Sequence, residues 1–315
     1  MKRLFSIILC TCNRPDLLKI ALESIAQLKT GPDFDYELLV IDNSSHGSLK
    51  KPVESLTPLF NGRLFYHTQP KRGKSFALNL GIQMAKGDIL AFTDDDIIAD
   101  ESWLLTLNAK FNAFACHGIG GRVMPVYPKE TPQWVKDNAV KLAGGVVIYD
   151  YGLMDFLFTR DHYAFIGANY AFKREVFQEC GEFRTDLGPG TPVMGEDTEF
   201  VERMLQQKKI LYYCGEVLIW HPVDLNRLTL RHMAKWHIAL GRYAAKREME
   251  NNVKISSYFF GIPRYLYRGL VTDALTLLIS VFHRMNFINA WRSFFRKIGL
   301  CQEYSLRKRF KLNNG

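Results

Sequence analysis

The chain has 315 residues, of which 47% are hydrophobic and 23% charged, and its net charge is +9. This composition excludes collagen-like, low-complexity and wholly disordered proteins, and the length allows one large domain with an appendage, or two domains. Residues 226–315 hold 17 Lys and Arg against 4 Asp and Glu (+13), which leaves 24 against 28 (−4) for residues 1–225. Any account of function must therefore explain a basic tail on a mildly acidic body.

Strand and helix patterns alternate in the first hundred residues. Apolar, β-branched runs predict strands at 4–10, 36–41, 63–67 and 88–93. Helical spacing predicts a helix that starts at Asn13–Asp16, where Asn can cap the helix and Pro is tolerated in its first turn, and another at 75–85. Short connections between strands and helices predict a parallel, doubly wound α/β sheet, whose ligands bind beyond the carboxyl ends of the strands.

The middle of the chain is less regular, and the end is helical. Prolines and paired glycines predict an inserted loop region with short strands at 121–165. The later elements expected are a regular segment at 163–172, a helix from Arg174, a helix at 197–207, a strand at 209–213, and basic, aromatic-rich helices from about residue 226.

The six cysteines include no CxxC pair and predict reduced thiols in a cytosolic protein, with Cys10 and Cys12 both in the core. No segment approaches the ~20 apolar residues that a membrane-spanning helix needs. The N-terminus turns polar too soon for a signal peptide. We therefore expect a chain that does not span a membrane.

Three consecutive carboxylates, Asp94, Asp95 and Asp96, follow the strand expected at 88–93. Such carboxylates repel one another unless a cation or solvent relieves the repulsion. In extended backbone Asp94 and Asp96 would point the same way and could share one ion, and carboxylates suit Mg²⁺ or Mn²⁺ bound together with substrate phosphates. Taken alone, the triplet is equally consistent with a solvated turn.

Glu196 and Asp197 form a second acidic group at the start of a predicted helix, where a simple helix cap would also explain them. The glycines of 188–192 before them make a loop that could close over a substrate. His221 is a possible third metal ligand, although a single histidine is more often structural.

Two further segments are candidates for nucleotide recognition. Asp42 ends the second strand, where it could form a turn or accept hydrogen bonds from a nucleoside. Residues 70–74 place cations and a glycine before a helix, which suits phosphate. Thr68 stands where a Walker motif requires glycine, and no GxGxxG, HExxH or GxSxG motif is present.

The order of these pieces resembles the family 2 glycosyltransferases of the GT-A fold. The resemblance covers roughly residues 4–225, and although each motif is weak alone, their joint order and spacing are specific. The motifs that carry it are Ile8–Pro15, Val40–Asn43, Gly73, Ala77–Gly81, Ala85–Asp88, Thr93–Asp96, Gly167–Asn169, Phe172–Phe177, Gly181–Phe183, Gly195–Asp197 and Trp220–His221.

The resemblance implies a GT-A, Rossmann-like α/β catalytic domain with a mostly parallel sheet at 1–225, with a donor half at 1–98 and an acceptor half at 99–225. A C-terminal helical extension would follow at 226–315. It also implies an inverting, metal-dependent transfer of a sugar from a nucleotide-sugar to an acceptor hydroxyl, in the synthesis of a cell-surface polysaccharide or glycolipid. UDP is the default nucleotide, with GDP and dTDP as alternatives.

The resemblance assigns roles to individual residues. Asp197 matches the catalytic base, and Glu196 would orient the acceptor. Asp94 and Asp96 match the family's DxD element and, with His221, would hold Mn²⁺ or Mg²⁺. The implied donor-binding residues are Thr11, Asn13, Arg14, Asp42, Lys71, Gly73, Lys74, Asn79, Asp94 and Asp95. Many members carry Arg where Ala77 or Leu78 stands, so the division of phosphate contacts between Arg72 and Lys74 stays open.

The tail mixes basic with aromatic residues at helical spacing. This pattern is typical of helices that lie in a membrane interface, where anionic lipid attracts each cation by about 1 kcal/mol. It predicts a peripheral enzyme on the inner face of the cell membrane that acts on a saccharide or lipid-linked acceptor. The alternative for the tail is a set of packed helices with a solvated basic face.

Two other classes of function remain to be weighed. A nucleic-acid-binding protein would fit the sequence pI of about 9.2, but the acidic body disfavours nucleic acid as a partner. A catalytically silent scaffold is disfavoured because the acidic motifs are intact.

Overall fold

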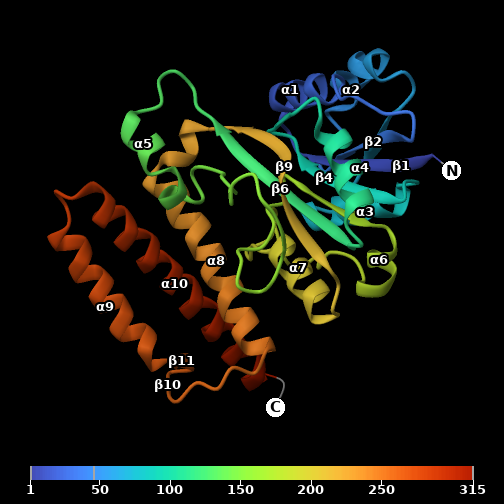
Figure 1. The fold of residues 1–315 in the computed structure, drawn as a ribbon. Coiled ribbons are helices and arrows are strands. Elements are labelled where there is room, and N and C mark those ends of the chain that lie inside the picture. The colour runs from blue at the N-terminus through green and yellow to red at the C-terminus, as the bar shows by residue number, and fades with distance from the viewer. Residues whose placement is uncertain (1, 45–46, 314–315) are drawn as a thin grey trace. The chain divides into compact units, whose positions relative to one another are not determined.

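A mixed sheet of nine strands, in the order β3-β2-β1-β4-β8-β6-β9-β5 with β7 beside β9, organises the first part of the chain (Figure 1). The computed structural model describes residues 2–44 and 47–313, with side chains described through residue 306. It divides into two compact units. Unit 1 comprises Met1–Val140, Val147–Gly190 and Glu196–Val223, and unit 2 comprises Lys141–Val146, Thr191–Gly195 and Asp224–Gly315.

The strands of the large sheet all belong to unit 1. They are β1 (Arg3–Thr11), β2 (Phe34–Asp42), β3 (Leu64–Thr68), β4 (Ile89–Asp94), β5 (Ile98–Ala99), β6 (Gly118–Val126), β7 (Asp155–Leu157), β8 (Tyr170–Lys173) and β9 (Leu211–Pro222). The α-helices of this unit are α1 (Pro15–Ile25), α2 (Lys50–Leu56), α3 (Lys74–Met84), α4 (Trp103–Ala113), α5 (Gln133–Asp137), α6 (Glu175–Cys180) and α7 (Glu196–Gln206).

The sheet has a parallel half and a mixed half. Strands β3, β2, β1 and β4 are parallel neighbours. Strand β8 then runs antiparallel to both β4 and β6, while β6 and β9 are parallel and lie side by side in Figure 1. The parallel half contains the four strands that the sequence predicted within residues 1–98, each within two residues of its expected bounds.

Apolar side chains fill the interior of unit 1. Residues 5–11 of β1 and 36–42 of β2 are all buried, as parallel strands covered on both faces should be. The ring of Phe92 on β4 is fully buried in an aromatic cluster, with centroid distances of 5.3–6.2 Å to its neighbours. These neighbours are Tyr170, Phe172, Phe177 and Phe183.

Strand β6 and helix α4 were not predicted. In β6, glycines hide the strand pattern. The structure shows why β6 needs them. A Cβ at Gly118 would lie 2.3 Å from the Phe172 ring, and one at Gly121 would lie 2.2 Å from the Val217 carbonyl oxygen. Close packing against β8 and β9 therefore takes the place of side chains at these positions.

Two local predictions in the first loop are wrong. Asn13 has a left-handed φ of 55° and does not cap α1, which begins at Pro15 after Arg14. Cys12 is exposed rather than part of the core, because β1 ends at Thr11 and the alternation of the strand ends with it. Cys10 is buried as expected.

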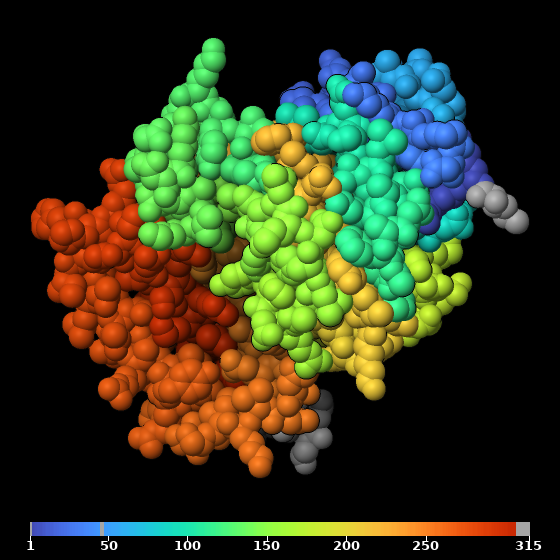
Figure 2. All heavy atoms as spheres, in the orientation of Figure 1, coloured from blue at the N-terminus to red at the C-terminus, as the bar shows by residue number. Residues whose placement is uncertain are grey.

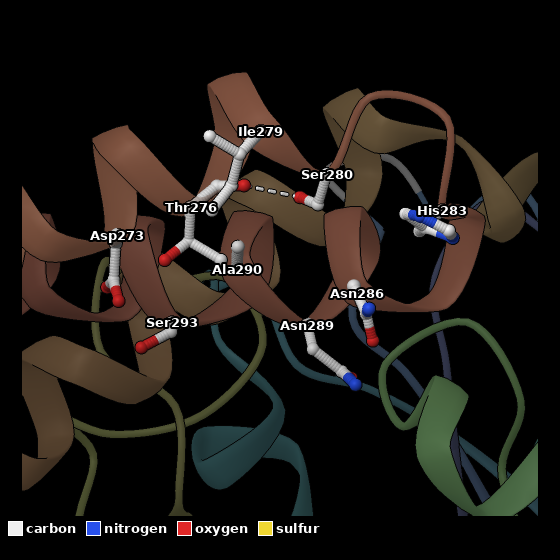
Figure 3. Close-up of a pocket in the computed structure, with 9 residues that line it drawn as sticks. All are labelled: Asp273, Thr276, Ile279, Ser280, His283, Asn286, Asn289, Ala290 and Ser293. Carbon is white, nitrogen blue, oxygen red and sulfur yellow. Dashed lines mark hydrogen bonds between the residues drawn. The ribbon is translucent and has the colours of Figure 1, made fainter.

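Unit 2 is largely helical. It contains α8 (Leu230–Glu250), α9 (Arg264–Ile279) and α10 (Arg284–Asn313), with a short hairpin of β10 (Tyr258–Phe259) and β11 (Ile262–Pro263) before α9. Helix α10 packs on both α8 and α9 and lies between them in Figure 1. Between α9 and α10 is a cavity of about 500 Å³, shown in Figure 3.

No helix in the described part of the chain combines the length and the apolar character that crossing a bilayer requires.

The aromatic cluster gives a test of the fold. We expect Phe92→Ala to lower the free energy of unfolding by about 3–5 kcal/mol, because it leaves a cavity among fixed rings. Phe65→Ala is the matched control on β3, where the ring is 37% exposed, and it should cost less than about 1.5 kcal/mol. Urea denaturation of both variants measures the difference, and equal losses would contradict this account of the core.

Candidate functional site

The register of the parallel strands brings four strand ends to one edge of the sheet. Thr11 at the end of β1 pairs with Asp42 at the end of β2, and Asp42 pairs with Thr68 at the end of β3. On the other side of β1, Cys10 pairs with Asp94 at the end of β4. The loops that follow all four strands therefore meet at this edge, where ligands of such sheets bind.

The three adjacent aspartates at the end of β4 each meet a different set of partners. The strand ends at Asp94 and the chain bends at residues 95–96, so the extended-backbone argument for a shared ion does not apply. Asp94 forms an ion pair with Lys74. Asp96 lies 3.5 Å from the Arg14 guanidinium and 3.2 Å from Nε2 of His221.

Asp95 ties the loop after β1 to the end of β4. Its carboxylate accepts hydrogen bonds from the Thr11 hydroxyl at 2.8 Å and from the Arg14 guanidinium at 3.1 Å. Burial raises the pKa of Asp95, and the positive charge of Arg14 opposes that change. Thr11, Arg14 and Asp95 are thus joined by hydrogen bonds at the predicted donor site.

Lys74 at the start of α3 supplies the cation nearest to the acidic groups. Burial alone would lower the pKa of Lys74, but the carboxylates of Asp94 and Glu196 outweigh it and raise that pKa. Gly167 leaves room for the ammonium, because a Cβ there would lie 3.1 Å from the Lys74 Nζ atom. Lys74 therefore stays charged inside the site.

Asp197 and Glu196 open α7, and both lie close enough to Lys74 to feel its charge. The Asp197 carboxylate accepts hydrogen bonds from the backbone N–H groups of Gly167 at 3.2 Å and Thr198 at 2.7 Å. Burial raises the pKa of Asp197, an effect that Lys74 chiefly opposes. Burial and the adjacent charge of Asp197 likewise raise the pKa of Glu196, whose carboxylate lies against Gly188.

The pair of Asp96 and His221 has the chemistry of a cation site. Nδ1 of His221 lies 3.0 Å from the Pro222 carbonyl oxygen, which can only accept, so Nδ1 carries a proton. If the ring is neutral, Nε2 is unprotonated and faces a carboxylate oxygen of Asp96 3.2 Å away. Two acceptors at this distance fit together when a proton or a metal cation lies with them.

Across the described side chains, no three His, Cys, Asp or Glu groups are placed to hold a metal by themselves. Asp94, the third predicted ligand, is directed to Lys74. A divalent cation on Asp96 and His221 would therefore take its other ligands from substrate phosphate and water, as Mg²⁺ commonly does.

Asp42 is fully buried and its carboxylate already holds the loop after β2. One oxygen accepts from the Ser44 N–H at 2.8 Å, and the other accepts from the Leu49 N–H at 3.2 Å and the Tyr66 hydroxyl at 2.7 Å. At most one lone-pair direction remains for a bound nucleoside.

Three predicted donor-binding residues lie in the loops around this edge. Asn13 lies in the loop after β1, and its side-chain oxygen is 3.4 Å from the Ser48 hydroxyl. Lys71 is exposed, with its ammonium 5.7 Å from the centre of the Phe76 ring. Gly73 has a φ of 136° and directly precedes α3.

The sequence model of "Glycosyl transferase family 2" matches residues 6–181, more than half of the chain. This chain belongs to glycosyltransferase family 2. The predicted family and the predicted transferase class are therefore confirmed.

Named relatives of this glycosyltransferase act in several biosynthetic systems. It is 26% identical over 234 residues to the succinoglycan biosynthesis protein ExoM of Rhizobium meliloti, which covers 74% of this chain and 71% of ExoM. It is 30% identical over 119 residues to the glucosyl-dolichyl phosphate glucuronosyltransferase of Haloferax volcanii. That match covers 37% of this chain and only 36% of the relative.

Among solved structures, the glycosyltransferase resembles the mannosyltransferase PcManGT of Pyrobaculum calidifontis, determined with GDP-mannose and Mn²⁺. The TM-score is 0.62 at 16% identity, covering 98% of this chain and 88% of PcManGT. At this identity the likeness establishes the fold. It confirms the predicted GT-A, Rossmann-like α/β fold with a helical C-terminal part.

Asn43 is a residue of the glycosyltransferase site that the sequence analysis did not single out. Its side-chain NH₂ donates to the carbonyls of Gln69 and Lys71, and its side-chain oxygen accepts from the Gly73 N–H at 2.9 Å. It thus holds the cationic loop before α3 to the end of β2. Its place directly after a strand-ending aspartate, in the Val40–Asn43 motif, was the available signal.

Asn79 was predicted to bind the donor. In the structure its side chain forms hydrogen bonds with the loop before α7. Its amide donates to the Phe183 carbonyl at 2.9 Å and accepts from the Phe183 N–H at 3.0 Å. Nearby, the Ser75 hydroxyl donates to the Leu187 carbonyl, and the Lys74 N–H donates to the Pro189 carbonyl. Helix α3 therefore fixes the glycine-rich segment at least as far as Pro189.

The two bonds of Asn79 predict a stability effect. Asn79→Ala should lower the free energy of unfolding by about 2 kcal/mol, because it leaves a buried N–H and C=O without partners. The control is Gln83→Ala on the next turn of α3, an exposed residue whose amide bonds Glu182, and it should cost less than about 0.5 kcal/mol. Chemical denaturation measures both, and a variant of unchanged stability that loses only donor affinity would overturn the structural role.

Proposed function

We propose that this glycosyltransferase moves a sugar from a nucleotide-sugar to an acceptor hydroxyl with inversion, using residues 1–225 as its catalytic domain. One observation carries the proposal. Gly167 donates its N–H to Asp197, and the same residue lies against the Lys74 ammonium, which in turn pairs with Asp94. A candidate base and the groups suited to a leaving diphosphate therefore lie in one site.

Asp197 is the proposed catalytic base. Its raised pKa makes it a stronger proton acceptor than an ordinary aspartate, and the two backbone N–H groups fix its orientation. A single displacement needs one such base and no protein nucleophile, which is the basis for proposing inversion. Glu196, whose carboxyl group lies close to the backbone of Gly188, is proposed to orient the acceptor.

Asp96 and His221 are the residues proposed to hold a divalent cation, Mn²⁺ or Mg²⁺, with Asp94 nearby. When bound, the cation would offset the charge that develops on the departing diphosphate. Lys74 supplies a fixed positive charge for the same purpose, and the neighbouring carboxylates keep it protonated despite its burial.

The proposed donor-binding residues divide into two groups by their contacts. Arg14, Lys71 and Lys74 bring positive charge to the strand edge and suit the diphosphate. The others hold the loops that shape the donor site, or line those loops. They are Thr11, Asn13, Asp42, Gly73, Asn79, Asp94 and Asp95.

We propose a UDP-sugar as donor, with GDP- and dTDP-sugars as the alternatives. ExoM is named for succinoglycan biosynthesis, and the Haloferax relative is named for a glucosyl-dolichyl phosphate, which is a lipid-linked sugar. These names support a saccharide or lipid-linked acceptor in the synthesis of a cell-surface polysaccharide or glycolipid. The +13 tail supports work at the inner face of the cell membrane.

The base assignment predicts a selective loss of chemistry. Asp197→Asn should lower the rate of sugar transfer at least 10²-fold, the scale of general-base catalysis, while donor affinity changes less than about threefold. Glu199→Gln is the control, because Glu199 lies on the same helix and pairs with Arg203. Transfer kinetics and donor titration separate the two effects, and normal turnover by Asp197→Asn would refute the assignment.

The metal assignment predicts metal-dependent binding. Asp96→Ala should weaken nucleotide-sugar binding about tenfold or more with Mn²⁺ present and have little effect with a chelator. Thermal-shift titration against several nucleotide-sugars, with and without Mn²⁺, measures this and also identifies the donor.

The control for the metal assignment is Asp100→Ala, because Asp100 bonds only its near neighbour Ser102 among the hydrogen bonds resolved for its side chain. Asp100→Ala should bind donor like the wild type. If Asp96→Ala loses the same affinity with and without the chelator, Asp96 does not hold the metal.

A further inference from the structure

Helix α9 turns an apolar face to solvent. Along this face, at helical spacing, lie Val271, Leu275, Leu278, Ile279 and, just after the helix, Phe282. Their exposed fractions run from 57% for Leu275 to 94% for Phe282. Figure 2 shows this segment, in orange-red, at the surface of the molecule. Isolated exposed apolar residues need no explanation, but a continuous stripe does.

The side of α9 that faces α10 carries polar groups beside the buried Leu266. Asp273, Thr276 and Ser280, with Ile279 at the edge of the stripe, line the cavity of about 500 Å³ toward α10, and Asn286, Asn289 and Ser293 of α10 line its other wall (Figure 3). A helix whose exposed face meets water has the reverse arrangement, with its apolar stripe turned inward. The distribution of side chains on α9 therefore indicates an apolar medium on its outer face.

The charges around the apolar stripe are positive. Arg264 and Arg268 are exposed on the first turns of α9, at helical spacing with the stripe. The acids of α9 and α10, over the residues whose side chains are described, are Asp273 and Glu303, and both are in ion pairs, with Lys297 and Arg242. The exposed side of α9 thus combines apolar area with uncompensated cations at one end.

The strand hairpin before α9 adds aromatic side chains at that end. Tyr258, Phe259 and Phe260 are 50–72% exposed and come just before Arg264. Aromatic rings and arginines are the side chains favoured at the headgroup level of a bilayer. The first end of α9 therefore carries the side chains that are typical of a membrane–water boundary, and the exposed ring of Phe282 follows its other end.

We propose that the outer face of α9, together with the turn at 280–283, lies in the interface of an anionic lipid membrane. The residues of the apolar stripe would be buried against the lipid acyl chains, and Arg264 and Arg268 would contact the lipid phosphates. A second copy of the chain is a poorer occupant, because the stripe offers no exposed carboxylate to the partner's arginines. This inference concerns where the enzyme works and does not rest on the proposed donor, metal or base.

Vesicle co-sedimentation of the full chain tests the proposal. The wild type should bind vesicles of phosphatidylcholine mixed with phosphatidylglycerol more tightly than vesicles of phosphatidylcholine alone. Leu278→Ser/Phe282→Ser should lower the partition constant about tenfold or more on both, because apolar burial is lost. Arg264→Gln/Arg268→Gln should weaken binding to the anionic vesicles alone, as should raised salt.

The matched control is Leu153→Ser/Met154→Ser, two side chains of unit 1 that are each 68% exposed. It should bind vesicles like the wild type. Sugar transfer to a water-soluble acceptor should be the same for all these variants, so a failure of the proposed chemistry would be seen separately.

Two results would overturn the proposal. One is vesicle binding by Leu278→Ser/Phe282→Ser that equals that of the wild type. The other is a wild type that binds neither kind of vesicle. If light scattering then shows that the wild type is a dimer and that Leu278→Ser/Phe282→Ser is a monomer, the occupant of the face is a second copy.

Discussion

Three buried or half-buried carboxylates in a row cannot remain charged at the end of a strand unless cations reach them, and this requirement determines the site. Asp94, Asp95 and Asp96 obtain their cations from distant parts of the chain: Lys74 from the start of α3 and Arg14 from the loop after β1. His221 at the end of β9 lies 3.2 Å from Asp96 and adds a further contact to the group. The need to offset the repulsion among the aspartates thus brings four segments into contact: the loop after β1, the start of α3, the end of β4 and the end of β9.

The same cation links the strand edge to the helix that carries the proposed base. Lys74 lies within reach of Asp94 on one side and near Glu196 and Gly167 on the other, so its charge is shared between two acidic groups. A donor diphosphate entering this place would compete with those carboxylates for the ammonium. Its binding would be helped by added positive charge, which is a physical argument for the proposed divalent cation on Asp96 and His221.

How much of this could be predicted depended on the kind of signal. The parallel half of the sheet followed from apolar runs, because most residues of β1, β2 and β4 are buried. Strand β6 did not, because its glycines are required by neighbouring rings and carbonyls that only the fold brings near. The acidic motifs of β4 and α7 both lie near Lys74 in the structure, yet the bend after Asp94 separates carboxylates that strand geometry would have aligned.

The hydrogen bonds that side chains form within the site could not be predicted from the sequence. Nothing local distinguishes Asn79, which holds the Phe183 backbone, from an asparagine that contacts a ligand. Asn43 and Asp42 likewise act on loops whose approach depends on strand register. The tail offered a different signal, since composition alone suggested a membrane interface, whereas only the burial of each residue separates the outer stripe of α9 from the side that faces α10. An enzyme with the proposed charged donor and the proposed lipid-linked acceptor would need two kinds of surface, one that concentrates charge and one that contacts lipid, and the residues proposed for them lie in different units of this chain.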